Sequence, residues 1–229
     1  MNIQKNDKQN ATITGIFFIL AAISSIIGLK LYDPILAETD FITSARQHHH
    51  AIVWGAINEL ILCITATGTG LMMYPYLKKY NESLGLGYLS FRMLEVVFIM
   101  MGIVAVLAVL SISQHYANHA IDKPTATALG LAFIEFHDWT FMLGPNFMLA
   151  INTFIYSYVF FQTRLVPKKL AILGLTSACL IMLAAMLEMF HIIEQISTLG
   201  VILAIPIAFY EMSLAVYLIR KGFQIEENK

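Results

Sequence analysis

The chain has 229 residues, of which 58% are hydrophobic and 13% are charged, and its formal net charge is -1 at pH 7. This composition excludes an ordinary soluble globular protein, because a soluble core cannot absorb so much apolar surface. The basic residues occur as short pairs between apolar runs and form no basic face, so we expect the lipid bilayer as a partner and no nucleic acid.

Six apolar windows are long enough for a helix to cross a bilayer, which takes about 20 residues. In chain order they cover residues 11–29, 51–76, 86–112, 141–162, 169–191 and 199–219. The first window is longer than the apolar part of a secretory signal and no cleavage pattern follows it, so we expect it to be retained. We predict an all-α, polytopic membrane helix bundle with six transmembrane helices, whose single domain covers 11–222 between tails at 1–10 and 223–229.

The basic residues between the windows predict how the chain is threaded. With the N-terminus inside, ten lysines and arginines fall in inner segments and three in outer segments, while Arg92 falls within a span. Cytoplasmic segments carry the excess of such residues, so we predict that both termini are cytoplasmic. In the long outer connection at 113–140, the part after Pro124 has helical spacing. It predicts an outward extension of the fourth span with a kink near Pro145, or an interfacial helix.

Charged residues inside the apolar windows are the first candidates for function. Arg92 and Glu95, in the stretch SFRMLEVVFIM, are three residues apart and therefore project from one face of a helix. Glu59 and Glu211 have no such partner on their own helices. A bare carboxylate in hydrocarbon costs at least ~2.5 kcal/mol, so the surplus of acids requires a proton, a cation or water. We predict a buried polar core of these four residues with at least one acid protonated at neutral pH; the alternative is a structural pair that sets helix register.

A second group of polar residues is expected near the outer surface. His137 and Asp138 precede the fourth span and are predicted to lie at the outer mouth of the polar core. Imidazole and carboxylate groups suit zinc or another transition metal, and the candidate ligands are His50, His137, Asp138 and His191. Glu188 and His191 have the Glu-x-x-His spacing of di-iron bundles, although such bundles contain two copies of it. Interfacial histidines that only form hydrogen bonds explain the same residues.

Several stretches of the sequence resemble a known family. They are TGIFFILAAISSIIG, RMLE, HDWTFMLGP, RLVPKKLAILG and AIPIAFYE followed by LIRKGF. Over nearly the whole chain they are similar to the bacterial and archaeal membrane proteins grouped as domain of unknown function 4386. The resemblance implies a multi-span protein of the cytoplasmic membrane, and it implies that the family pattern includes Glu59, Arg92, Glu95, His137, Asp138 and Glu211. It implies no mechanism, because the family has no assigned activity.

Three functions fit the sequence. The first is a transporter-like or sensor-like module for a proton, a small cation or an amphipathic ligand, although no inverted repeat with paired broken helices is evident. The second is a metal-dependent membrane hydrolase for a lipid-like substrate, with Glu59 as general base. His137 and Asp138 superficially resemble the hydrolases related to alkaline ceramidase and adiponectin receptors, but the paired histidines of those proteins are missing from the windows. The third is a structural or assembly subunit. The sequence predicts neither the ligand nor the oligomeric state.

Overall fold

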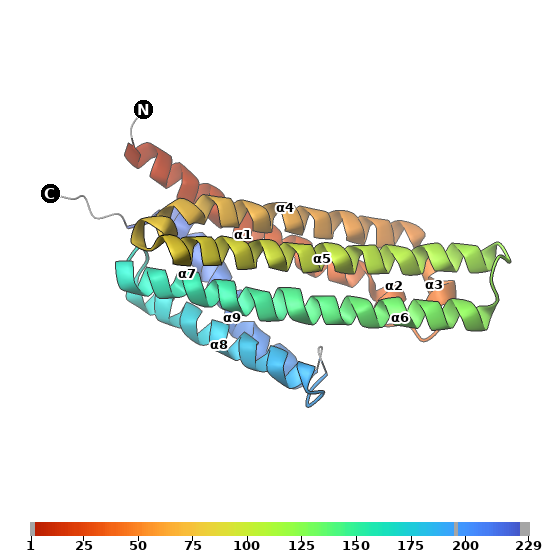
Figure 1. Ribbon diagram of the computed structural model, residues 1–229. Coiled ribbons are helices and arrows are strands. Elements are labelled where there is room, and N and C mark those ends of the chain that lie inside the picture. Colours follow the sequence, from red (N-terminus) through yellow and green to blue (C-terminus); the bar gives the residue numbers. More distant parts are fainter. Residues whose placement is uncertain (1–2, 195–196, 225–229) are drawn as a thin grey trace.

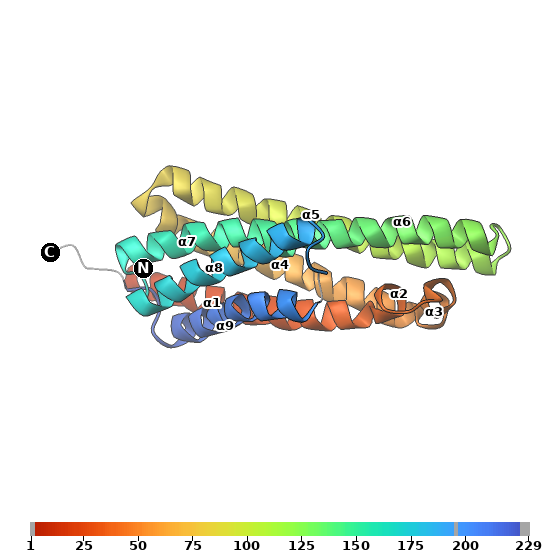
Figure 2. The same ribbon diagram turned by 90° about the horizontal axis from the view of Figure 1, so that it is seen from below.

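The computed structural model describes residues 3–194 and 197–224, with side chains from residue 7 onward. This part of the chain is helical and forms an elongated bundle (Figures 1 and 2). The elements are α1 (Ile3–Leu31), α2 (Asp33–Leu36), α3 (Phe41–Gln47), α4 (His49–Tyr80), α5 (Glu82–Ala117), α6 (Lys123–Phe141), the π-helix η1 (Met142–Met148), α7 (Leu149–Thr163), α8 (Lys168–Met189) and α9 (Thr198–Arg220). The predicted tail at 223–229 lies mostly outside the described residues, and the segment predicted as a tail at 1–10 is helical from Ile3 on.

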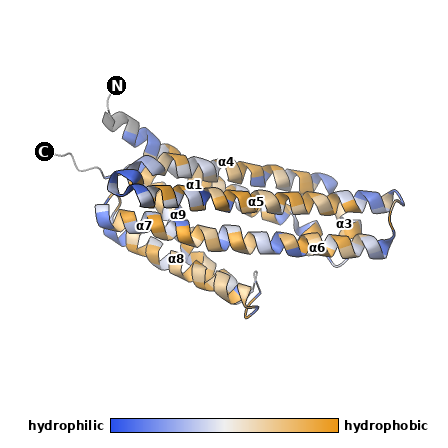
Figure 3. Cartoon of the chain, viewed as in Figure 1, coloured by the Kyte–Doolittle hydropathy of each residue, from blue (hydrophilic) through white to orange (hydrophobic). Residues whose placement is uncertain are grey.

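Five of the described helices are long and apolar enough to cross a membrane. They are α1 from Asp7 on, α4, α5, α8 and α9. The predicted fourth span falls on three consecutive elements, because α6, η1 and α7 follow one another from Lys123 to Thr163. Apolar residues fill the middle of the bundle, and hydrophilic residues gather toward its ends (Figure 3). The helical fold and the apolar helices agree with the predicted class.

The helix predicted after Pro124 is confirmed, and it continues directly into η1 and α7. Pro145 lies inside η1, where the helix adopts π geometry. A proline lacks the backbone N–H and crowds the preceding turn of an α-helix, and a π-helical turn is one way for a helix to accommodate such a position. At 1.5 Å per residue, the 36 residues of α5 extend about 54 Å and the 22 residues of α8 about 33 Å. The hairpin of α5 and α6 therefore reaches well beyond α8 and α9 (Figure 1).

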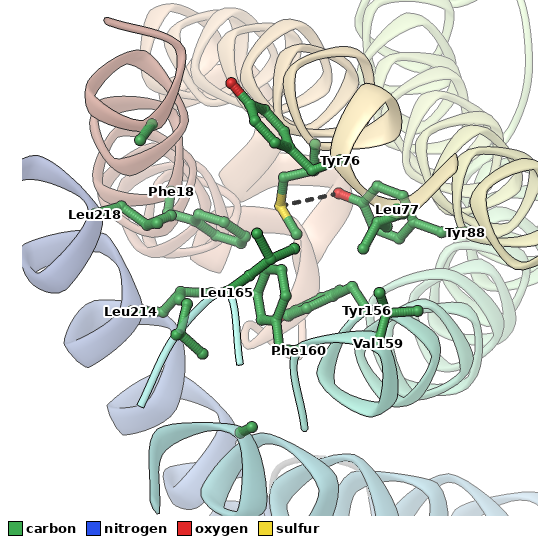
Figure 4. Packing of buried hydrophobic residues seen from close by; sticks show 14 of the residues in the cluster. Phe18, Tyr76, Leu77, Tyr88, Tyr156, Val159, Phe160, Leu165, Leu214 and Leu218 are labelled. Carbon is green, nitrogen blue, oxygen red and sulfur yellow. Dashed lines mark hydrogen bonds between the residues drawn. The ribbon is translucent and has the colours of Figure 1, made fainter. Parts of the chain in front are cut away.

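Two large apolar clusters make up most of the core. The first lies toward the end of the bundle where α1 begins and α9 ends. Its aromatic residues, all labelled in Figure 4 except Tyr210, are Phe18, Tyr76, Tyr88, Tyr156, Phe160 and Tyr210. We call it the aromatic cluster. The second contains residues of α2, α3, α4, α5 and α6 around Ile42 and Val106. On α5, Tyr88 belongs to the first cluster and Val96 to the second, so the buried charged residues Arg92 and Glu95 lie between the two.

Candidate functional site

Arg92 and Glu95 form the ion pair that their spacing predicts. Arg92 Nη1 donates to Glu95 Oε2 at 2.9 Å and to Oε1 at 3.2 Å. The side chains of the two residues are only 4% and 6% exposed. A spacing of three residues places both groups on one face of α5. Each charge is therefore compensated without access to water.

Groups from two other helices complete the hydrogen bonding of the pair. On α4, the Thr69 hydroxyl accepts a hydrogen bond from Arg92 Nε at 3.1 Å. On α7, Asn152 Nδ2 donates to Glu95 Oε2 at 2.6 Å. A Cβ atom on Gly70 would lie 3.4 Å from Arg92 Cγ, so this glycine leaves room for the arginine stem. The ion pair thus connects α5 to both α4 and α7.

Glu211 of α9 lies near the same pair. Arg92 attracts its carboxylate and Glu95 repels it, so all three groups are within electrostatic reach of one another. Glu211 Oε1 is buried and makes no hydrogen bond to any part of the chain that the structure describes. Counted at 1.5 Å per residue from the helix ends nearest the termini, Arg92 lies about 15 Å, Glu211 about 14 Å and Asn152 about 17 Å along their helices. They therefore lie at a similar level along the bundle, and the hydrogen bond from Asn152 to Glu95 agrees with this.

Glu59 lies at a second level, together with His137. Both residues line a cavity of about 20 Å³, to which Ser25 and Thr140 also contribute. A cavity of this size has room for about one water molecule. Glu59 is 6% exposed and His137 is 3% exposed. Both side chains therefore border the same small cavity and are largely shielded from bulk water.

Asp138 connects this buried pair to the surface. His137 Nδ1 lies 3.1 Å from Asp138 Oδ1, and the Asp138 side chain is 49% exposed. The rings of Tyr32 and His137 pack edge to face, with 6.2 Å between their centroids. Close approach of α1 and α4 builds this region, because a Cβ atom on Gly28 would lie 2.8 Å from Glu59 Cγ. The glycine thus allows α1 to cover the Glu59 side chain.

Cys63 lies between the two levels of buried charge. It follows Glu59 by one turn of α4 and is 5% exposed. It is within electrostatic reach of both Glu59 and Glu95. These polar groups form a series along the bundle that leads inward from the half-exposed Asp138. We call it the polar column: Asp138, His137, Glu59, Cys63, Glu95, Arg92, Asn152 and Glu211.

A wider pocket of about 550 Å³ adjoins the column at the end of α8. Asp138 lines this pocket, which we call the vestibule, with Glu135, Trp139, Met142, Glu188, His191, Ile193 and Glu194. Four of these residues are acids. Glu188 is 8% exposed, and its Oε2 accepts a hydrogen bond from Asn146 Nδ2 at 2.8 Å. Asp138 is the residue that belongs to both the vestibule and the polar column.

The four candidate metal ligands do not all lie together, although Asp138 is hydrogen-bonded to His137 and lines the vestibule with His191. His50 is exposed at the start of α4, whereas His137 is buried beside Glu59. His191 lies beyond the end of α8 at Met189 and has a φ of 54°, so its spacing from Glu188 does not place the two on one helix face. Across residues 3–194 and 197–224, no group of three or more His, Cys, Asp or Glu could hold a metal ion. The residues present therefore do not fit the zinc or di-iron sites that their spacing suggested.

Several polar residues of the site were not among the predicted candidates. Asn152 is an amide within an apolar window, so a search extended from charged residues to amides finds it. Thr69 is harder to identify, because a threonine in a membrane helix usually bonds to a carbonyl of its own helix. Thr69 does so as well, donating to Ala66 O at 2.7 Å. Its contact with Arg92 depends on how α4 and α5 pack.

Comparison with known proteins identifies the family and nothing more specific. A family model described as Domain of unknown function (DUF4386) matches residues 13–222, which is nearly the whole chain. No curated protein and no solved structure matches it. The match covers every residue of the polar column, in agreement with the resemblance seen in the sequence. The chain belongs to the DUF4386 family of proteins of unknown function.

Proposed function

We propose that this protein is a proton-exchanging, sensor-like module of the bacterial or archaeal cytoplasmic membrane. It crosses the bilayer six times, with the helix from α6 to α7 as the fourth span and both termini in the cytoplasm. Basic residues near the end of the bundle with the termini support this orientation: Lys78, Lys79, Arg164, Lys168, Lys169, Arg220 and Lys221. Lys5 and Lys229, which also enter the charge argument, lie outside the described side chains.

The series of groups from Asp138 to His137, and from His137 across a shared cavity to Glu59, carries the proposal. It leads from a half-exposed carboxylate, through an imidazole 3.1 Å away, to a carboxyl group buried beside a water-sized cavity. Imidazole can accept a proton on one nitrogen and release one from the other. His137 Nδ1 faces Asp138, so Nε2 is the nitrogen available to a water molecule in the cavity. A space of about 20 Å³ admits water and excludes an organic ligand from this part of the column.

Arg92 and Glu95, at the other level of the column, have a different role in this proposal. Arg92 fixes a positive charge in the column and is neutralised by Glu95, so it biases the protonation of nearby acids without exchanging a proton itself. Toward the cytoplasmic end the aromatic cluster closes the bundle with tightly packed rings (Figure 4). Tyr88 and Tyr156 meet edge to face, and Tyr156 stacks on Tyr210. This packing favours exchange with one side of the membrane over continuous conduction.

Infrared difference spectroscopy on the protein in liposomes tests the proposal. A change of external pH between 5 and 8 should alter the carbonyl band of a protonated carboxyl group, and Glu59→Gln should remove that band. Glu82→Gln is the matched control, because Glu82 is an exposed acid at the opposite end of the bundle. An unchanged pH-dependent band in Glu59→Gln would exclude Glu59 as the exchanging group. If Asp138→Asn delays the pH-dependent change of this band without abolishing it, Asp138 is the point at which the proton enters.

The alternative functions draw less support. A metal-dependent hydrolase requires ligands that converge, and the candidate histidines lie apart. An assembly subunit explains the Arg92–Glu95 pair. It gives no reason for the buried acid Glu59 to share a water-sized cavity with His137, which in turn contacts the half-exposed Asp138. An amphipathic ligand does not fit the cavity of about 20 Å³ in the column and would bind outside it, for example in the vestibule.

A further inference from the structure

Buried oxygen atoms without hydrogen-bond partners gather at the level of Glu211. They are Glu211 Oε1, Asn152 Oδ1, Thr153 Oγ1 and Tyr156 Oη, none of which bonds to another group of the described chain. Asn152, Thr153 and Tyr156 lie within four residues of one another on α7 and are at most 1% exposed. Tyr156 stacks on Tyr210, the residue before Glu211 on α9, with 6.0 Å between the ring centroids. The three α7 residues therefore lie where α7 meets Glu95 of α5 and the Tyr210–Glu211 segment of α9.

The chemistry of these atoms indicates the type of ligand. A buried polar atom without a partner is unfavourable, and such atoms are rare in native structures. The Asn152 amide nitrogen is already bonded to Glu95 at 2.6 Å, so the orientation of the amide is set and its oxygen remains as an acceptor. A carboxylate, an amide oxygen and two hydroxyl oxygens are ligands that hard cations prefer.

The charge balance indicates the valence of that cation. The charged groups that face Glu211 are Arg92 and Glu95 of α5, and the neighbouring titratable hydroxyls belong to Tyr88, Tyr156 and Tyr210. With one arginine and two carboxylates, the region has a net charge of -1. One monovalent cation balances this charge, whereas a divalent cation would leave a positive excess in the hydrocarbon region. A proton on Glu211 also balances the charge, but its single O–H can satisfy only one acceptor.

We propose that Glu211, Asn152, Thr153 and Tyr156 bind one dehydrated monovalent metal cation of the sodium type at the middle of the membrane. Glu211 supplies the charge, and the three α7 residues replace water in the coordination shell. Arg92 and Glu95 position Asn152 through the Glu95 carboxylate. The site lies at a different level from Glu59 and His137, so it does not depend on proton exchange there.

Thermal unfolding of the full-length protein in detergent tests this site. Sodium chloride is compared with choline chloride at equal ionic strength and fixed pH. At sodium concentrations about 100 times Kd, we expect a Tm about 5–10 °C higher than in choline. Glu211→Gln should abolish the difference, because Gln keeps the size of the side chain and removes its charge. Thr153→Val should raise the sodium concentration required by about tenfold while preserving the fold.

The control variant is Glu188→Gln, which removes a different buried carboxylate outside the site. It should retain the full sodium-dependent increase in Tm. Equal Tm values in sodium and choline would overturn the proposal and leave a proton on Glu211 as the balancing charge. An increase that persists in both Glu211→Gln and Thr153→Val would place the cation elsewhere. An increase retained in Glu59→Gln, even if that variant loses proton exchange, would show that the cation site stands on its own.

Discussion

Replacing Arg92 with methionine should destabilise the protein strongly, because it leaves the Glu95 carboxylate buried without its partner. Arg92 donates three hydrogen bonds to side chains: two to Glu95 and one to Thr69. Its side chain is 4% exposed, so water cannot replace the lost contacts. Removing one member of a buried ion pair typically costs about 3–5 kcal/mol. For a chain of this size, that corresponds to a decrease in Tm of about 6–20 °C.

A double-mutant cycle separates the ion pair from simple loss of packing. The assay is thermal unfolding of detergent-purified protein followed by circular dichroism. Adding Glu95→Gln to Arg92→Met removes the stranded charge and should recover most of the lost stability, since an uncharged replacement of a buried pair is often nearly neutral. Recovery should be more complete when Glu211→Gln is added as well, because Arg92 also attracts the Glu211 carboxylate.

Lys78→Met is the matched control for this cycle. Lys78 pairs with Glu82 at 3.0 Å, but the two side chains are 48% and 65% exposed. Exposed pairs contribute little to stability, so this variant should unfold close to the wild-type temperature. If Arg92→Met were no more destabilising than Lys78→Met, or if Glu95→Gln gave no recovery, the idea that Arg92 compensates buried acids would be refuted.

Three further changes test the packing and capping around the site. Asn146→Ala should cost about 1–3 kcal/mol in detergent unfolding, because it leaves the buried Glu188 carboxylate without its donor at 2.8 Å. Gly174→Ala should cost about 1–3 kcal/mol by overpacking, since its Cβ atom would lie 2.3 Å from a hydroxyl oxygen of α7. Hydrogen bonds from the Thr125 hydroxyl and backbone N–H hold the pKa of Asp122, the N-cap of α6, below its usual value of 3.8. Its stabilisation is therefore present above pH 3.8 and lost as the pH falls through the lowered pKa. Amide exchange at the start of α6 should accelerate below that pH, and Asp122→Asn should remove this dependence.

Helices and one ion pair could be predicted from the sequence because they depend on local order along the chain. Runs of apolar residues of bilayer length locate α1, α4, α5, α8 and α9, since each helix satisfies its own backbone hydrogen bonds. Arg92 and Glu95 could be paired because they are three positions apart on one helix. That spacing places both side chains on the same face, however the other helices pack. Helical spacing after Pro124 predicted α6 for the same reason.

Contacts between helices were decided only by the tertiary structure. Asn152 is 57 residues from Glu95, and Thr69 is 23 residues from Arg92, so nothing in the local pattern indicates that they meet. Sequence spacing is also no guide where a helix ends: Glu188 and His191 are three residues apart, but α8 stops at Met189, so helical spacing does not set their relative directions. The rotation and depth of each helix determine which polar groups share a level, and these depend on how neighbouring side chains pack rather than on the order of residues along any one helix.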